Sequence, residues 1–232
     1  MIKIYKKENH GKSNLGWLQS LFHFSFAEYR NNQRIHYGNL RVINDDLILA
    51  GTGFDMHPHN DMEIISYVVD GELTHQDSMG NKHSIGRGNI QYMSAGTGIF
   101  HSEHNLGKTV TRLLQIWIYP DKKGCKPSYG DHEFSWNQRK NKLLHMVSPL
   151  DGNAPVKIHQ NANLYSLELT KDNEITFNLQ PGWEVYAVQI EGNSVVNSLD
   201  FNERDGLESN ENLHVKAKST SHMLFIELKK EK

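Results

Sequence analysis

The sequence is organised around the stretch Gly51-Thr-Gly-Phe-Asp-Met-His-Pro-His-Asn-Asp-Met-Glu63. If this stretch is a β-strand, successive side chains point to opposite faces, so His57 and His59 share one face. A His-x-His pair occurs often by chance, and alone it is weak evidence for a metal site. Other residues must supply further ligands before metal binding can be predicted.

A second stretch, Gly96-Thr-Gly-Ile-Phe-His-Ser-Glu103, supplies such residues. By the same alternation His101 and Glu103 share a face. If the two strands face each other inside a barrel, three imidazoles and one carboxylate converge on one point. We therefore predict a metal site, with Glu63 of the first stretch as another source of the carboxylate.

The predicted ligand types restrict the metal. Imidazoles with a carboxylate suit Fe(II), Mn, Co, Ni, Cu or Zn, whereas the absence of thiolate argues against a structural zinc site. Four protein ligands leave about two positions open in an octahedral shell. A substrate or dioxygen could occupy them, so the site can perform chemistry.

Composition limits the partners and the location. The chain has 232 residues, with Lys+Arg 25 and Asp+Glu 27, a net charge of −2, a pI near 6.7 and a mean hydropathy of −0.63. This balance offers no broad basic face for direct nucleic-acid binding and no polybasic membrane anchor, although it allows a protein partner. A single cysteine, Cys125, excludes an intrachain disulfide. Charges near the N-terminus and the lack of a long apolar run predict a cytoplasmic protein without a membrane segment.

Short strands separated by glycine turns predict an all-β fold. Residues 64–69 form an almost continuous apolar run and predict a central strand, and residues 110–119 predict a long closing strand. Residues 40–43 and 47–50 predict a hairpin whose turn is Asn-Asp-Asp at 44–46.

The chain divides into two parts of similar style. Residues 121–142 are rich in Lys, Gly, Pro, Asp and Asn and predict a linker with a short helical turn near 132–136. We therefore expect an N-terminal metal-binding domain at 1–135 and a C-terminal domain at 136–232. His159, His214 and His222 of the second part are isolated, so we expect them to be ordinary strand or surface residues.

The spacing of these residues also resembles a known family. Gly51, His57, His59 and Glu63, followed by a second glycine-rich motif with a late histidine, follow the two cupin motifs. Departures from the general cupin pattern, such as Ser94 in place of proline, mark the pirin family. Segments that resemble pirins lie at 22–27, 40–46, 51–54, 57–59, 91–98 and 101–103, and the likeness is strong over 14–118. Weaker likeness to bacterial pirin-like quercetinases extends over the second half.

The resemblance implies a fold and a ligand set. It implies two tandem cupin barrels, that is, double-stranded β-helices, of which the C-terminal one is degenerate and lacks the metal. The family's ligands match His57, His59, His101 and Glu103, and iron is its usual metal. Glu63 would then lie behind the ligands or in a structural ion pair.

The resemblance also implies an activity, namely that of a quercetin 2,3-dioxygenase. A flavonol-like aromatic enol and O2 would be the substrates, Glu103 would act as general base, and the ring would open with release of carbon monoxide. Phe54 and Phe100 lie beside the ligands in sequence and are predicted walls of the pocket. Two alternatives remain: a non-enzymatic regulator that binds a transcription factor or a metabolic enzyme, and a cupin enzyme acting on another enol.

Overall fold

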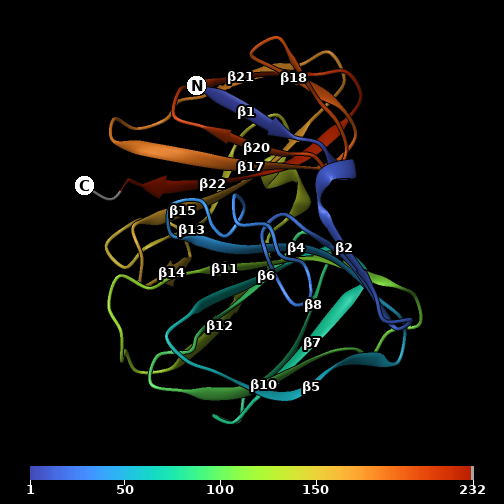
Figure 1. Ribbon diagram of the computed structural model, residues 1–232, viewed down its shortest axis with the longest axis vertical. Coiled ribbons are helices and arrows are strands. Elements are labelled where there is room, and N and C mark those ends of the chain that lie inside the picture. The colour runs from blue at the N-terminus through green and yellow to red at the C-terminus, as the bar shows by residue number, and fades with distance from the viewer. Residues whose placement is uncertain (231–232) are drawn as a thin grey trace. The chain divides into compact units, whose positions relative to one another are not determined.

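The computed structural model describes residues 1–230, which are built almost entirely from β-strands (Figure 1). The all-β prediction is confirmed. The chain separates into two compact units. The first, here called the N-terminal barrel, contains residues 11–134 and 158–160. The second, the C-terminal barrel, contains residues 1–10 and 135–157 and continues from residue 161.

The N-terminal barrel consists of two facing sheets, ordered β12-β9-β6-β11-β4-β3-β2 and β5-β10-β7-β8. Its apolar core contains Ile48, Val68, Leu73 and Leu113. Its strands are β2 (Gly11–Asn14), β3 (Leu18–Phe22), β4 (Leu40–Ile48), β5 (Thr52–His59), β6 (Glu63–Asp70), β7 (Glu72–Asp77), β8 (Lys82–Gly86), β9 (Ile90–Ser94), β10 (Ile99–Asn105), β11 (Thr111–Ile118) and β12 (Ser128–His132).

The C-terminal barrel has the same two-sheet plan, with orders β1-β20-β17-β22-β15-β13-β14 and β16-β21-β18-β19. Phe177 and Phe225 stack in its core with ring centroids 5.0 Å apart. Its elements are β1 (Ile2–Tyr5), the 3-10 turns η1 (Lys7–Asn9) and η2 (Trp136–Arg139), β13 (Leu144–Pro149), β14 (Val156–Ile158), β15 (Ala162–Leu169), β16 (Glu174–Phe177), β17 (Trp183–Glu191), β18 (Ser194–Val196), β19 (Leu199–Phe201), β20 (Gly206–Ser209), β21 (Leu213–Ala217) and β22 (Ser221–Lys229).

The N-terminal strand β1 belongs to the C-terminal barrel. It pairs antiparallel with β20, from Ile2 opposite Ser209 to Tyr5 opposite Gly206, and Figure 1 shows it beside β20 and β17. The two compact units therefore do not follow a single division of the chain at residue 135. The domain ranges 1–135 and 136–232 stay a prediction. Pairing between residues some two hundred positions apart leaves no local pattern in the sequence.

Two local predictions were wrong. Residues 44–46 are not a turn, because β4 runs unbroken from Leu40 to Ile48 between β3 and β11. Hydrogen bonds from two neighbouring strands and burial override the turn preference of Asn and Asp. The predicted linker also contains strand β12, which pairs with β9 at one edge of its sheet. The predicted strands at 64–69 and 110–119 are confirmed as β6 and β11.

Helices contribute little to the molecule. Within residues 1–230, no helix has the length and apolar character required to cross a bilayer.

Candidate metal centre

Three imidazoles meet where β5 pairs with β10 in the N-terminal barrel. His57 lies directly opposite His101 in this register, and His59 lies two residues further along β5. The ring centroids are 4.5 Å apart for His57 and His101, 4.9 Å for His57 and His59, and 5.0 Å for His59 and His101. One ring nitrogen from each lies within 4.8 Å of the others. The structure thus brings the three predicted histidines together.

A close approach between the two backbones makes this pairing possible. Gly53 of β5 sits opposite His104 of β10. A Cβ at Gly53 would lie 2.3 Å from the carbonyl oxygen of Glu103 and 2.5 Å from the Cα of His104. Only glycine fits there without moving backbone.

The pKa values of His59 and His101 suit the binding of a cation. Burial lowers the pKa of His59 to about 4, helped by the nearby His57, and burial is also the main cause that lowers the pKa of His101 to about 4. Both rings are therefore neutral near pH 7. His57 donates from Nδ1 to the carbonyl oxygen of Asp55 at 2.7 Å, which leaves its Nε2 as the atom with the lone pair. His101 Nε2 is buried and has no hydrogen-bond partner within residues 1–230. An unpaired nitrogen on the neutral His101 ring, beside the neutral His59, fits a divalent metal.

Glu103 lies two residues after His101, beyond a register shift in β10, and is 2% exposed. Its carboxylate accepts hydrogen bonds from Ser66 Oγ at 2.6 Å, from Gln115 Nε2 at 2.7 Å and from Gln91 Nε2. The three donors stand opposite one another on β9, β6 and β11, so the sheet register builds this polar row.

These contacts keep Glu103 ionised. Burial alone would raise its pKa, but His101 and the donors Ser66 and Gln115 outweigh burial and lower the pKa of Glu103 below its usual value. Its ligand atoms gather with those of His75 and His101, within 4.8 Å of one another, rather than with all three predicted histidines. His101 is the residue common to both groups.

Glu63 is placed differently. It is 1% exposed and accepts hydrogen bonds from Ser94 Oγ at 2.6 Å and from the backbone N–H of His159 at 3.1 Å. Burial raises its pKa. Glu63 belongs to neither group of ligand atoms found among the described residues.

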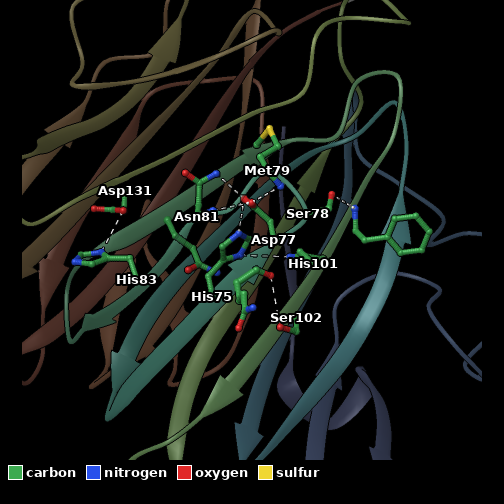
Figure 2. A network of polar contacts seen from close by, with 12 residues as sticks. His75, Asp77, Ser78, Met79, Asn81, His83, His101, Ser102 and Asp131 are labelled. Atoms are coloured by element: carbon green, nitrogen blue, oxygen red, sulfur yellow. Dashed lines mark hydrogen bonds and ion pairs between the residues drawn. The ribbon is translucent and has the colours of Figure 1, made fainter.

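Two further polar residues, His75 and Asp77, form a chain of contacts that leads to His101 (Figure 2). Asp77 accepts hydrogen bonds from the backbone N–H groups of Met79 at 2.9 Å and Asn81 at 3.1 Å, and from Asn81 Nδ2 at 2.8 Å. It also accepts from His75 Nε2 at 3.1 Å. These bonds overcome the effect of burial and lower the pKa of Asp77, so it is a carboxylate.

The Asp77 carboxylate determines which ring nitrogens of His75 and His101 carry protons. Because His75 Nε2 donates to Asp77, the Nδ1 of a neutral His75 carries the lone pair. That Nδ1 lies 3.5 Å from His101 Nδ1, which can donate to it. His101 Nε2 then carries its lone pair toward His57 and His59. Tyr129 stacks on the His75 ring with centroids 4.3 Å apart and restricts its rotation.

A cavity of about 280 Å³ opens onto the three imidazoles. Its apolar wall includes Phe22, Phe26, Phe54 and Ile64, and its polar wall includes Asn44, Asp46 and Trp117. Phe54 is thus a wall residue, as predicted. Phe100 is 52% exposed and does not line this cavity, but it lines a second hollow that also includes His59.

Sequence reasoning missed most of the polar residues around the histidines. The sequence patterns single out none of His75, Asp77, Ser66 and Gln115, and they include Gln91 only as the first residue of the pirin-like segment at 91–98. One signal in the sequence could have found them, namely a polar residue within an otherwise apolar strand. Ser66 is such a residue, because it lies in β6, which is buried from Glu63 to Val69.

The fold and the histidine cluster define a protein with two cupin barrels, of which the N-terminal one holds a candidate metal site. The family described as Pirin matches residues 4–118, and the family described as Quercetinase C-terminal cupin domain matches residues 145–228. A quercetin 2,3-dioxygenase of Escherichia coli (strain K12) is 40% identical over 231 residues, which cover 98% of this chain and 99% of that protein. A pirin-like protein of Caulobacter vibrioides is 42% identical over 197 residues, which cover 84% of this chain and 85% of that protein.

Solved structures agree with these relatives. The crystal structure of YhhW from Escherichia coli superposes with a TM-score of 0.93 at 39% identity and covers 100% of this chain and 99% of that one. Bacterial pirin YhhW in complex with nickel(II) superposes with a TM-score of 0.92 at 38% identity, with 100% of both chains covered. The chain belongs to the pirin family.

Proposed function

We propose that this protein is a metal-dependent dioxygenase of the quercetin 2,3-dioxygenase type. It would consume one flavonol and one O2 and release a ring-opened ester and one carbon monoxide. The observation that carries the proposal is the cavity of about 280 Å³ that ends at the three clustered imidazoles of His57, His59 and His101. Its size is close to the lower limit of small-molecule pockets, roughly 300 Å³. The quercetin dioxygenases among its relatives support the same activity.

We assign the metal to His57, His59, His101 and Glu103. Fe(II) is our first choice, with Ni, Co, Mn, Cu and Zn as alternatives, since the imidazole and carboxylate donors suit each of them. When bound, the ion would supply Lewis acidity toward the enol hydroxyl and an open position for dioxygen. The nickel(II) complex of YhhW supports metal binding in a closely similar fold.

The protein's own residues would hold the substrate and move its proton. Phe22, Phe26 and Phe54 would pack on the flavonol rings and exclude water from the reacting carbon. Glu103, ionised and beside His101, would accept the enol proton as general base. Because three hydrogen bonds stabilise its anion, Glu103 can take that proton only from an acidified enol.

The test is carbon monoxide release. Metal-free protein is loaded separately with Fe(II), Ni(II), Co(II) or Mn(II) and incubated with quercetin and O2, and carbon monoxide is measured against quercetin consumed. We expect one molecule of gas per quercetin, and strong loss of activity in Glu103→Gln. Glu63→Gln, which changes a buried carboxylate outside both ligand groups, is the matched control and should retain metal. No carbon monoxide with any of these metals would refute the proposal.

The alternative is a non-enzymatic regulator that binds a transcription factor or a metabolic enzyme. It rests on family membership, and a protein partner captured only in one iron oxidation state, without flavonol turnover, would favour it. A cytoplasmic location also stays a prediction.

A further inference from the structure

The wall of the cavity formed by β4 carries two buried polar side chains. Asn44 and Asp46 alternate with Asp45, so both project into the barrel, where they line the cavity. Asp45 points the other way and forms a bidentate pair with Arg112 at 2.9 and 2.8 Å. Asn44 is 3% exposed and Asp46 is 2% exposed. Among residues 1–230, no ion pair involves Asn44 or Asp46, and both lie inside strand β4 rather than in a turn.

Each of these side chains has an unused acceptor. Ser20, opposite Asp46 on β3, hydrogen-bonds to its carboxyl group, yet Asp46 Oδ1 has no partner within residues 1–230. The same holds for Asn44 Oδ1. Buried acceptors without donors are unfavourable and rare, so each of them points to a partner that comes from outside the chain.

The neighbouring strand β11 adds an unused donor. Trp117 lines the same cavity, and its Nε1–H is buried without an acceptor among residues 1–230. Its ring stands edge-on to His59, with centroids 4.9 Å apart, so this donor lies close to the imidazole cluster. The cavity therefore offers two acceptors on β4 and one donor on β11.

We propose that Asn44 and Asp46 bind hydroxyl groups of an aromatic substrate and that Trp117 binds its carbonyl oxygen. The site would then select polyhydroxylated aromatic ketones over unsubstituted ones of the same ring skeleton. The identity of the reacting enol rests on the proposed function, whereas the selection for ring hydroxyls rests on the unpaired atoms. A site built to pair with substrate hydroxyls discriminates strongly against analogues that lack them.

Two probes separate these contributions. Quercetin and 3-hydroxyflavone share the enol and the carbonyl, but only quercetin carries hydroxyls on the other rings. Their affinities for nickel-loaded protein are measured without oxygen by tryptophan fluorescence, in wild type, Asn44→Leu and Asp46→Leu. We expect wild type to prefer quercetin by about tenfold or more, and each substitution to reduce that preference by about tenfold. Leu15→Ala, at a 63% exposed apolar position of the same cavity, should leave the preference unchanged.

The outcomes are decisive in either direction. An unchanged preference in both leucine variants overturns the proposal, and so does loss of nickel in them, since these residues would then serve the metal rather than the ligand. If the variants fail to fold, equal affinity of the wild-type protein for both probes, or no binding of quercetin, overturns it. Because oxygen is absent, a failure of dioxygenase activity does not affect this result. Turnover of quercetin together with equal affinities for quercetin and 3-hydroxyflavone would refute the selection for ring hydroxyls and leave the dioxygenase proposal intact.

Discussion

Asp77→Asn should weaken metal binding although Asp77 is not among the assigned ligands. The substitution keeps the volume of the side chain, and its remaining oxygen can still accept from the backbone N–H groups of Met79 and Asn81. The other oxygen, however, becomes an NH2 group that faces His75 Nε2, formerly 3.1 Å away, and Asn81 Nδ2, formerly 2.8 Å away. To avoid donor against donor, His75 must carry its proton on Nδ1 instead.

The changed tautomer of His75 then affects the tautomer of His101. With a proton on His75 Nδ1, the 3.5 Å contact to His101 Nδ1 would set two donors against each other. His101 relieves this by moving its proton to Nε2, the atom that faces His57 and His59 and that should bind the metal. Loss of such an outer hydrogen-bond partner costs about tenfold to a hundredfold in metal affinity, or about 1.4 to 2.7 kcal/mol.

Nickel affinity is measured by competition with a chelator, and ¹⁵N shifts of the histidine rings report the tautomer of His101 in metal-free protein. Asp131→Asn is the matched control, because Asp131 pairs with the half-exposed His83 at 3.1 Å on an outer strand of the same barrel (Figure 2). We expect Asp77→Asn to lose affinity and to show the proton on Nε2, and the control to do neither. Unchanged nickel affinity in Asp77→Asn would contradict the assigned tautomers of His75 and His101.

Three further substitutions test the surroundings of the site. Burial is the main cause that raises the pKa of Asp46 from 3.8 to about 7, so the folded protein loses stability as pH rises from 3.8 to about 7, where the unfolded chain has already released this proton. Asp46→Asn should therefore stabilise metal-free protein by about 4 kcal/mol at pH 8 and by much less at pH 5. Urea unfolding measures the effect, and equal midpoint shifts at both pH values would contradict the raised pKa of Asp46. Gln115→Leu removes the donor 2.7 Å from Glu103 Oε2 and should cost about 1.5 to 3 kcal/mol in urea unfolding; a cost near zero would show that the bond is unimportant. Gly53→Ala should disrupt the β5–β10 pair and abolish nickel binding, whereas Gly86→Ala, whose added Cβ would lie 3.9 Å from its nearest neighbour, should be tolerated; equal behaviour of the two would argue against the close approach.

The sequence was sufficient for the features that depend on local periodicity. Apolar runs predicted β6 and β11, and alternation placed His57 and His59 on one face, where the structure has them. The family resemblance supplied the two-barrel fold, which composition and spacing alone could not.

Features set by distant pairing were not predictable in this way. The turn preference of Asn-Asp-Asp at 44–46 concealed the most polar part of β4, because burial between β3 and β11 decides the outcome there. His75 reaches His101 only through the register of β7 with β10, in which His101 lies opposite Asp77 and Glu103 opposite His75. A one-residue change in that register would turn His75 to the other face.

His57, His59 and His101 should together hold one divalent metal in the N-terminal barrel. The metal content of wild type and of His59→Ala, measured after loading with nickel and removal of free metal, tests this assignment, with far-UV circular dichroism as the check of folding. We predict one nickel per wild-type chain and none in His59→Ala with an unchanged spectrum, since the barrel core does not include His59. A full equivalent of nickel in folded His59→Ala would show that His59 is not a metal ligand.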